Sequence, residues 1–99
     1  FSPRVMDSWG LTWDAIRGRN PRAVYLRAPA FGLDGPWRDR VGFAMTMEQV
    51  GGLANRTGHP DGPRLLPQGP VDMFAAMHSV LAVLLALVDR ERTGTGQLI

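Results

Sequence analysis

Cysteine and lysine are both absent from this chain of 99 residues, and all eleven of its basic residues are arginines. Without cysteine, the chain can form no disulfide, thiolate metal site or cysteine nucleophile. Without lysine, no side chain can form a Schiff base with a substrate. The two histidines, His59 and His78, stand at unrelated positions with no acid at ligand spacing. We therefore expect no bound metal.

Strong charge and long apolar runs are also lacking. The formal net charge is only +2, and the arginines are scattered, which argues against a nucleic-acid partner. The opening residues show no secretory signal pattern. The longest apolar run, Val80–Val88, is shorter than the roughly 20 residues that a membrane-spanning helix needs. We expect neither a nucleic-acid nor a membrane partner, and a cytoplasmic location, with which the lack of cysteine is consistent.

The overall composition is that of a globular protein, with 44% apolar and 20% charged residues. A core built from 99 residues alone is marginal. The chain starts at Phe1 instead of a methionine and stops within Gln97–Ile99, which resembles the opening of a strand. We expect residues 1–99 to form a single incomplete domain from a longer polypeptide.

One long helix dominates the sequence. From Val71 to Arg92 neither glycine nor proline occurs, and Gly94 is expected to stop the helix. One face is broadly apolar, with Phe74, Met77, His78, Leu81, Leu84, Leu85 and Val88 at helical spacing. The opposite face consists mostly of small residues, namely Ala75, Ala76, Ser79, Ala82 and Ala86, with Arg90. The pattern predicts a helix buried in something larger than itself, with another backbone close to its small face.

The rest of the chain predicts a mixed α/β fold, rich in helices, with short strands and long Gly/Pro loops. The expected elements, in order, are an irregular Phe1–Gly10, a Thr12-capped helix ending before Gly18, a strand over Ala23–Ala28, and a helix over Phe43–Val50 stopped by Gly51–Gly52. Glycine- and proline-rich loops of this length usually line a site.

Asp72 lies in the first turn of the long helix, where unpaired N–H groups and the helix dipole favour a carboxylate. One interpretation is a helix-capping acid. The other is a nucleophile or base presented at the edge of a core. Neither His78 nor Ser79 can reach it from the same helix, because one faces elsewhere and the other lies about 10 Å along the axis. A partner must come from another segment.

Short motifs along nearly the whole chain resemble one known family. In order they are Phe1–Leu11, Asn20–Arg22, Phe31–Gly32, Gly35–Pro36, Arg38–Arg40, Gly42–Phe43, Gly51–Leu53, Thr57–Gly58, Pro60–Pro63, Asp72 and Arg90–Gln97. As an ordered set they resemble the class III coenzyme A transferases of the CaiB/BaiF or formyl-CoA transferase type. The Arg92-Thr-Gly-Thr-Gly-Gln97 ending is the most characteristic of these motifs.

This resemblance implies a central fragment of a Rossmann-like large domain, from an intact protein that is an interlocked homodimer. It implies that Asp72 is the catalytic aspartate, which attacks an acyl-CoA thioester to give a mixed anhydride and then an aspartyl-CoA thioester. A carboxylic acid acceptor completes the exchange. Coenzyme A enters as a substrate thioester, and no cofactor is held permanently. By position, the residues that match the family's CoA groove are Phe1, Val5, Ser8, Trp9 and Phe31.

The chain also departs from the family pattern. Ser8 stands where a basic residue is common, which leaves two alternatives: one phosphate contact is missing, or Arg4 supplies it. Pro29-Ala30 replaces a Ser-Gly pair. The family includes 2-methylacyl-CoA racemases, which carry a histidine where this chain has Phe43. The alternatives are therefore a racemase-type isomerase fragment, and a non-catalytic fragment that binds CoA or a partner chain. The glycine-rich lid of the family is not in these 99 residues.

Overall fold

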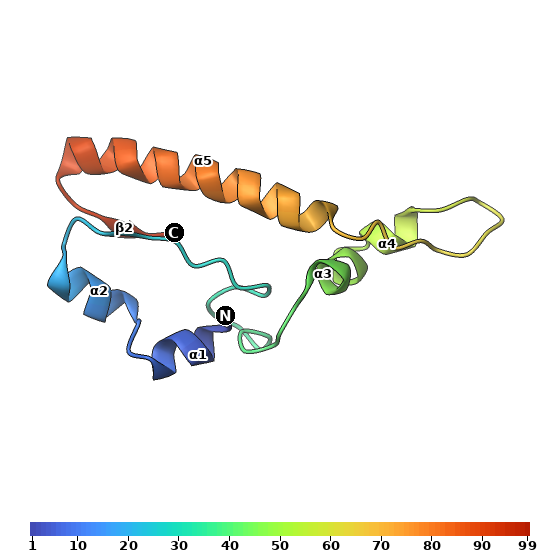
Figure 1. Cartoon of the computed structure of the whole chain (residues 1–99), viewed down its shortest axis with the longest axis horizontal. Coiled ribbons are helices and arrows are strands. Elements are labelled where there is room, and N and C mark those ends of the chain that lie inside the picture. Colours follow the sequence, from blue (N-terminus) through green and yellow to red (C-terminus); the bar gives the residue numbers. More distant parts are fainter.

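The computed structural model describes residues 1–99, which form five helices and two short strands (Figure 1). In chain order they are α1 (Pro3–Ser8), α2 (Trp13–Arg19), β1 (Val24–Tyr25), α3 (Ala44–Val50), α4 (Leu53–Arg56), α5 (Pro70–Thr93) and β2 (Gln97–Leu98). Long and mostly irregular segments join β1 to α3 and α4 to α5. The predicted α/β class, rich in helices with short strands and long Gly/Pro loops, is confirmed.

The two strands pair in parallel, with Val24 opposite Gln97 and Tyr25 opposite Leu98. Ile99 extends the pairing, because its N–H donates to the Tyr25 carbonyl and its carbonyl accepts from Arg27 N–H, both at 2.9 Å. The prediction that the chain ends in a strand is confirmed, whereas the strand predicted over Ala23–Ala28 is shorter. Helix α5 lies along one side of the strands and α1 and α2 lie on the other (Figure 1).

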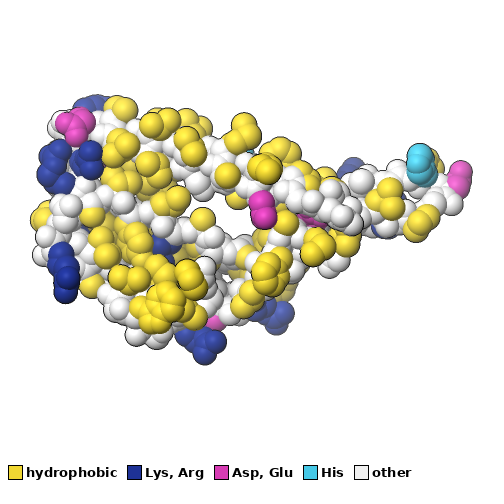
Figure 2. All heavy atoms as spheres, viewed as in Figure 1, with side chains coloured by type: hydrophobic (Ala, Val, Ile, Leu, Met, Phe, Trp, Pro, Cys, Tyr) yellow, Lys and Arg dark blue, Asp and Glu magenta, His cyan; other side chains and the backbone are white.

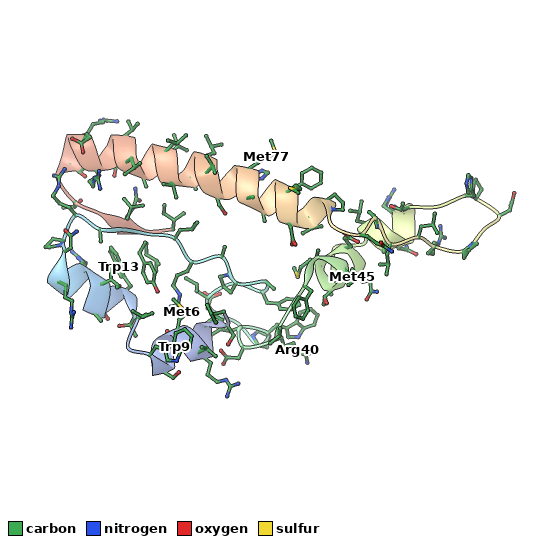
Figure 3. All side chains as sticks on the ribbon, in the orientation of Figure 1. Met6, Trp9, Trp13, Arg40, Met45 and Met77 are labelled. Atoms are coloured by element: carbon green, nitrogen blue, oxygen red, sulfur yellow. The ribbon has the colours of Figure 1, made fainter.

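Helix α5 is the predicted long helix, extended by one residue at each end to 24 residues. It stops at Gly94, whose φ of 76° is left-handed and whose N–H donates to the Arg90 carbonyl at 2.8 Å. Its small face turns inward, where Ala86 is 3% exposed. Its apolar face turns outward, and Figure 3 shows Met77, which is 70% exposed, projecting away from the strands. The predicted small face is therefore correct at Ala86 but not at Ala76, which lies beside Met77 and Val80 on the outward side. This chain does not cover the apolar face.

By length and composition alone, α5 is sufficient to cross a membrane, with a mean hydropathy of 2.1 over its most apolar 18-residue window. The argument that the run Val80–Val88 is too short to span a membrane was therefore wrong, because the length that matters is that of the whole helix. The surroundings of the helix argue against a bilayer. Strands β1 and β2 lie beside α5 with open edges, and open sheet edges do not occur in hydrocarbon.

The N-terminal segment differs from its prediction. Phe1–Gly10 was expected to be irregular, but Pro3 begins α1, because proline at a first helical position has no N–H to leave unpaired. Helix α2 has the predicted cap, with Ala15 N–H donating to Thr12 Oγ1 at 3.3 Å. It runs through Gly18 to Arg19 instead of ending before the glycine.

The motif after α5 fastens the end of that helix to the start of β1. Arg22 donates to the Gly94 carbonyl at 3.3 Å and to the Glu91 carboxylate at 3.2 Å. Gly96 N–H donates to the Pro21 carbonyl at 2.7 Å. A Cβ on Gly96 would lie 1.9 Å from the Ala23 carbonyl oxygen. The most characteristic motif of the sequence is therefore structural here, since it seats β2 against β1.

A closed hydrophobic core is lacking. Only 4 of the 99 residues are buried, and Ala54 and Ala86 are the buried hydrophobic ones. The radius of gyration is 17.0 Å, against about 13 Å for a compact domain of this length. Figure 2 shows hydrophobic side chains along the outer side of α5 and over the α1 and α2 end of the molecule. The chain is an open scaffold with broad apolar surfaces.

Candidate active site

The carboxyl end of β1 and the N-terminus of α5 define one end of the α/β unit. In parallel α/β units, ligands bind beyond the carboxyl ends of the strands. Three adjoining cavities, of about 150, 220 and 250 Å³, lie here and share Ala28 and Pro29, which follow β1. The segment after β1 is therefore a wall common to all three cavities, which are together called the groove below.

The largest of the three cavities, about 250 Å³, contains Asp72. Its lining residues come from the segment after β1, from α3 and its approach, and from α5: Ala28, Pro29, Ala30, Gly42, Phe43, Met47, Val71, Asp72 and Ala75. The Asp72 side chain is exposed and forms no hydrogen bond or ion pair within the chain. The carboxylate is thus an accessible, unpaired negative charge among apolar walls.

The capping interpretation of Asp72 is not supported by its hydrogen bonds. The N-cap of α5 is Gly69, which precedes Asp72 by three residues, and no side chain caps the helix. Asp72 N–H donates to the Gly69 carbonyl at 3.2 Å. What remains is the favourable interaction of a carboxylate with a helix N-terminus, about 0.3–1 kcal/mol. His78 is not a partner, since its Nδ1 pairs with the Phe74 carbonyl at 2.7 Å.

Phe1 lines the other two cavities, of about 220 and 150 Å³. Its ring meets Trp9 edge-on, with centroids 4.9 Å apart. Arg40 lines the 220 Å³ cavity, and its guanidinium lies 5.2 Å from the centre of the Trp37 ring. Figure 3 shows Trp9 and Arg40 on the side of the strands opposite α5. The Phe1 ring, with Trp9 packed against it, and the Arg40 cation therefore lie at a cavity that does not contain Asp72.

Of the predicted groove residues, only Phe1 lines these three cavities, and Trp9, Val5, Ser8 and Phe31 do not. Val5 and Ser8 lie on α1, where Ser8 Oγ donates to the Val5 carbonyl at 2.8 Å. Phe31 packs edge-on against Trp37, with ring centroids 5.4 Å apart. The structure places Phe1 and Asp72 in different cavities of the groove, and it leaves Trp9, which packs on Phe1, with Val5, Ser8 and Phe31 on the surrounding framework.

That framework is held by one carboxylate between two arginines. Asp7 on α1 pairs with Arg27 at 3.1 Å and with Arg38. The hydrogen bond from Arg38, together with the one from Arg27, holds the pKa of Asp7 below its ordinary value. The two arginines also donate to backbone carbonyls, Arg27 to Pro3 at 3.2 Å and Arg38 to Leu33 at 2.9 Å. The cluster joins α1 to both ends of the segment that walls the groove.

Two features of the site lay outside the sequence prediction. Gly42 lets its own backbone lie close to Ala30 and Met47. A Cβ at Gly42 would lie 2.5 Å from the Ala30 Cβ and 3.2 Å from the Met47 sulfur. Glu48 on α3 is fully buried and accepts backbone hydrogen bonds from the turn that enters α5. The only sequence signal for Glu48 was an acid within a short, mostly apolar helix, which ordinarily indicates a solvated position.

Comparisons with known proteins are consistent over the whole chain. The family model described as CoA-transferase family III matches residues 1–99. The chain is 42% identical over 101 residues to the succinyl-CoA–L-malate CoA-transferase beta subunit of Chloroflexus aurantiacus, covering 100% of this chain and 25% of the relative. It is 41% identical over 98 residues to formyl-CoA:oxalate CoA-transferase of Streptomyces avermitilis, covering 98% and 24%.

A solved structure agrees with these relatives. A CAIB/BAIF family protein from Brucella suis superposes with a TM-score of 0.90 at 34% identity, over 100% of this chain and 26% of that one. The chain therefore spans about a quarter of the length of the proteins it matches.

Proposed function

The chain belongs to CoA-transferase family III, and from that membership we propose that the whole protein moves coenzyme A from an acyl-CoA donor to a carboxylic acid. Residues 1–99 are then the central part of its large domain. The observation that carries the proposal is the unpaired Asp72 carboxylate at the N-terminus of α5, facing a groove that begins where β1 ends.

The proposed chemistry uses Asp72 as the nucleophile. Its carboxylate attacks the thioester carbonyl, forming a mixed anhydride and releasing CoA thiolate. The thiolate attacks the aspartyl carbonyl, which gives an aspartyl-CoA thioester and frees the first acid as its carboxylate. The acceptor carboxylate reverses these two steps, leaving as a new acyl-CoA and restoring Asp72. The first turn of a helix suits this role because its N–H groups and dipole favour negative charge.

The groove supports a thioester substrate at Asp72. Its walls near Asp72 are apolar and suit an acyl chain. Its far end carries Phe1 and Arg40, which suit the anionic and partly aromatic coenzyme A. The relatives are named for transfer to malate and oxalate, and we propose a small carboxylic acid as the acceptor class. The coenzyme is then a substrate and no cofactor is held permanently.

We also propose that the whole protein is an interlocked homodimer. The outward face of α5 supports this proposal, because Met77, Leu81, Leu85 and Val88 are each more than half exposed and a further layer of protein would cover them.

Replacing Asp72 by Asn in the whole protein tests the nucleophile. The amide keeps the shape of the side chain and, since no capping hydrogen bond is lost, should leave the protein folded. We expect CoA transfer to fall by at least about 1,000-fold, as for a removed nucleophile. Asp72→Glu keeps the charge but shifts it by about 1 Å, which is expected to cost on the order of 100-fold. Asp89→Asn, an exposed acid near the other end of α5, is the matched control and should retain activity.

Trapping makes the test direct. Incubation of the wild type with acyl-CoA and then hydroxylamine should convert Asp72 to a hydroxamate, because anhydrides and thioesters are both electrophilic. Mass spectrometry of the peptide that contains Asp72 measures this adduct. Full transfer activity in a folded Asp72→Asn protein would overturn the assignment.

A further inference from the structure

Glu48 is the one fully buried carboxylate of the chain, with a side chain 0% exposed. Its two oxygens accept hydrogen bonds from the backbone, Oε1 from Gly69 N–H at 2.6 Å and Oε2 from Gln68 N–H at 3.1 Å. No arginine pairs with it. A buried charge is retained only where its oxygens are satisfied, and here two N–H groups from one turn satisfy them.

The turn that Glu48 holds has an unusual backbone. Gln68, with φ of 61°, is the only non-glycine residue at positive φ, and Gly69 follows with φ of 130°. Such a conformation persists only where the surroundings enforce it. Hydrogen bonds to a charged acceptor are stronger than neutral ones, so the carboxylate of Glu48 supplies that enforcement.

The same turn places the candidate nucleophile. Gly69 is the N-cap of α5, and no side chain of α5 caps the helix. Asp72 lies three residues later, and its N–H donates to the Gly69 carbonyl at 3.2 Å. Met47, the neighbour of Glu48 on α3, lines the cavity that contains Asp72, whereas Glu48 does not. Helix α3 thus contributes both a wall of the cavity and the anchor of the helix that carries Asp72.

We propose that Glu48 is a positioning residue for CoA transfer, which fixes the Gln68–Gly69 turn and thereby the position of the Asp72 carboxylate in its cavity. The inference rests on the proposed role of Asp72. Glu48 touches neither the groove nor the substrate, so its effect reaches the reaction only through the first turn of α5.

Glu48→Gln in the whole protein tests this role. The amide keeps the volume but has one acceptor oxygen, and its NH₂ group faces a backbone N–H that also donates. The turn should loosen and Asp72 should move. We expect kcat for CoA transfer to fall between about 10-fold and 100-fold, the range for sub-ångström to 1 Å misplacement. KM for acyl-CoA should stay within about threefold, because the far end of the groove is unchanged. Binding at that end stabilises the ground state and the transition state equally.

Expressing the reaction rate per competent active site separates an effect on the position of Asp72 from an effect on the amount of folded protein. The amount of hydroxamate trapped at Asp72 counts competent sites, and its rate of formation measures attack by Asp72 at each site. In Glu48→Gln this rate should fall while the final amount stays near that of the wild type. Ala54→Gly, which loosens α4 at its one buried residue, is the control for lost stability. It should lower the melting temperature with an unchanged rate per site.

Gly69→Ala tests whether the Gln68–Gly69 turn positions Asp72 while Glu48 is intact. It replaces Glu48→Gln as the test if that variant does not accumulate as folded protein. A Cβ on Gly69 meets no atom within 4 Å, but φ of 130° strains any side chain, so that the turn shifts without a clash. We expect the same loss of kcat with KM nearly unchanged.

A wild-type rate per site in folded Glu48→Gln, or in Gly69→Ala should the former not fold, would overturn the positioning role. That result would leave the role of Asp72 untouched if Asp72→Asn is inactive. An active Asp72→Asn would instead overturn the proposed function and this inference together.

Discussion

Asp7 and Asp72 are the same side chain in opposite surroundings. Asp7 lies between Arg27 and Arg38, which lower its pKa and neutralise its charge. Asp72 has no partner in the chain and faces a cavity. A carboxylate held by two guanidinium groups is a poor nucleophile, because its lone pairs are engaged. Of these two acids, only Asp72 is free to attack a thioester, and Asp7 is the one that holds the framework.

Phe43 determines whether the site can move a proton as well as transfer CoA. It lines the cavity with Asp72, and its ring can neither accept nor donate a proton where related racemases are expected to place an imidazole. We therefore expect the whole protein to transfer CoA much faster than it exchanges the acyl α-proton with solvent. Mass spectrometry of acyl-CoA recovered from D₂O, with transfer followed in the same sample, measures both rates. Deuterium uptake as fast as transfer would favour the racemase alternative.

The junction between α5 and β2 depends on one close approach between two backbones. A Cβ on Gly96 would lie 1.9 Å from the backbone oxygen of Ala23, and neither backbone can move without opening the parallel pair. We expect Gly96→Ala to destabilise the whole protein by about 3 kcal/mol or more, the upper range for forced overpacking. The urea midpoint of unfolding measures the change.

Gly18→Ala is the matched control for that substitution. Gly18 lies inside α2 with no atom within 4 Å of an added Cβ, so alanine should stabilise the helix by about 0.5–1 kcal/mol. Equal midpoints for Gly96→Ala and the wild type would show that the strands do not need this approach.

The elements also show where sequence reasoning succeeds. Helix α5 was predicted to within one residue at each end, because apolar periodicity and a stopping glycine are local signals. Asp72 was placed in its first turn for the same reason. Helix α1 was missed within the segment predicted to be irregular, although a proline such as Pro3 is common at a first helical position. The role of Glu48 was out of reach, since its partners lie 20 and 21 residues away and no local pattern records such contacts.

The whole molecule is a scaffold whose apolar surfaces exceed its interior. Twenty large hydrophobic side chains are exposed, whereas only Ala54 and Ala86 are buried hydrophobic residues. Many of the exposed ones line the outer side of α5 (Figure 2). Surfaces of this extent on a soluble chain are normally covered by other protein, which agrees with relatives that are about four times as long.

Residues 1–99 prepared alone should therefore be inactive and should self-associate. The outward face of α5 carries Met73, Met77, Val80, Leu81, Leu84 and Leu85, each at least 54% exposed, and burying these side chains against another copy removes them from water. Sedimentation velocity should show concentration-dependent species larger than a monomer. Leu81→Lys with Leu85→Lys should reduce that association, because a lysine is costly to bury unpaired, whereas Asp61→Asn on the distant exposed loop should leave it unchanged. A stable wild-type monomer that turns over acyl-CoA by itself would contradict this expectation, since it would require the open scaffold to complete its site from these residues alone.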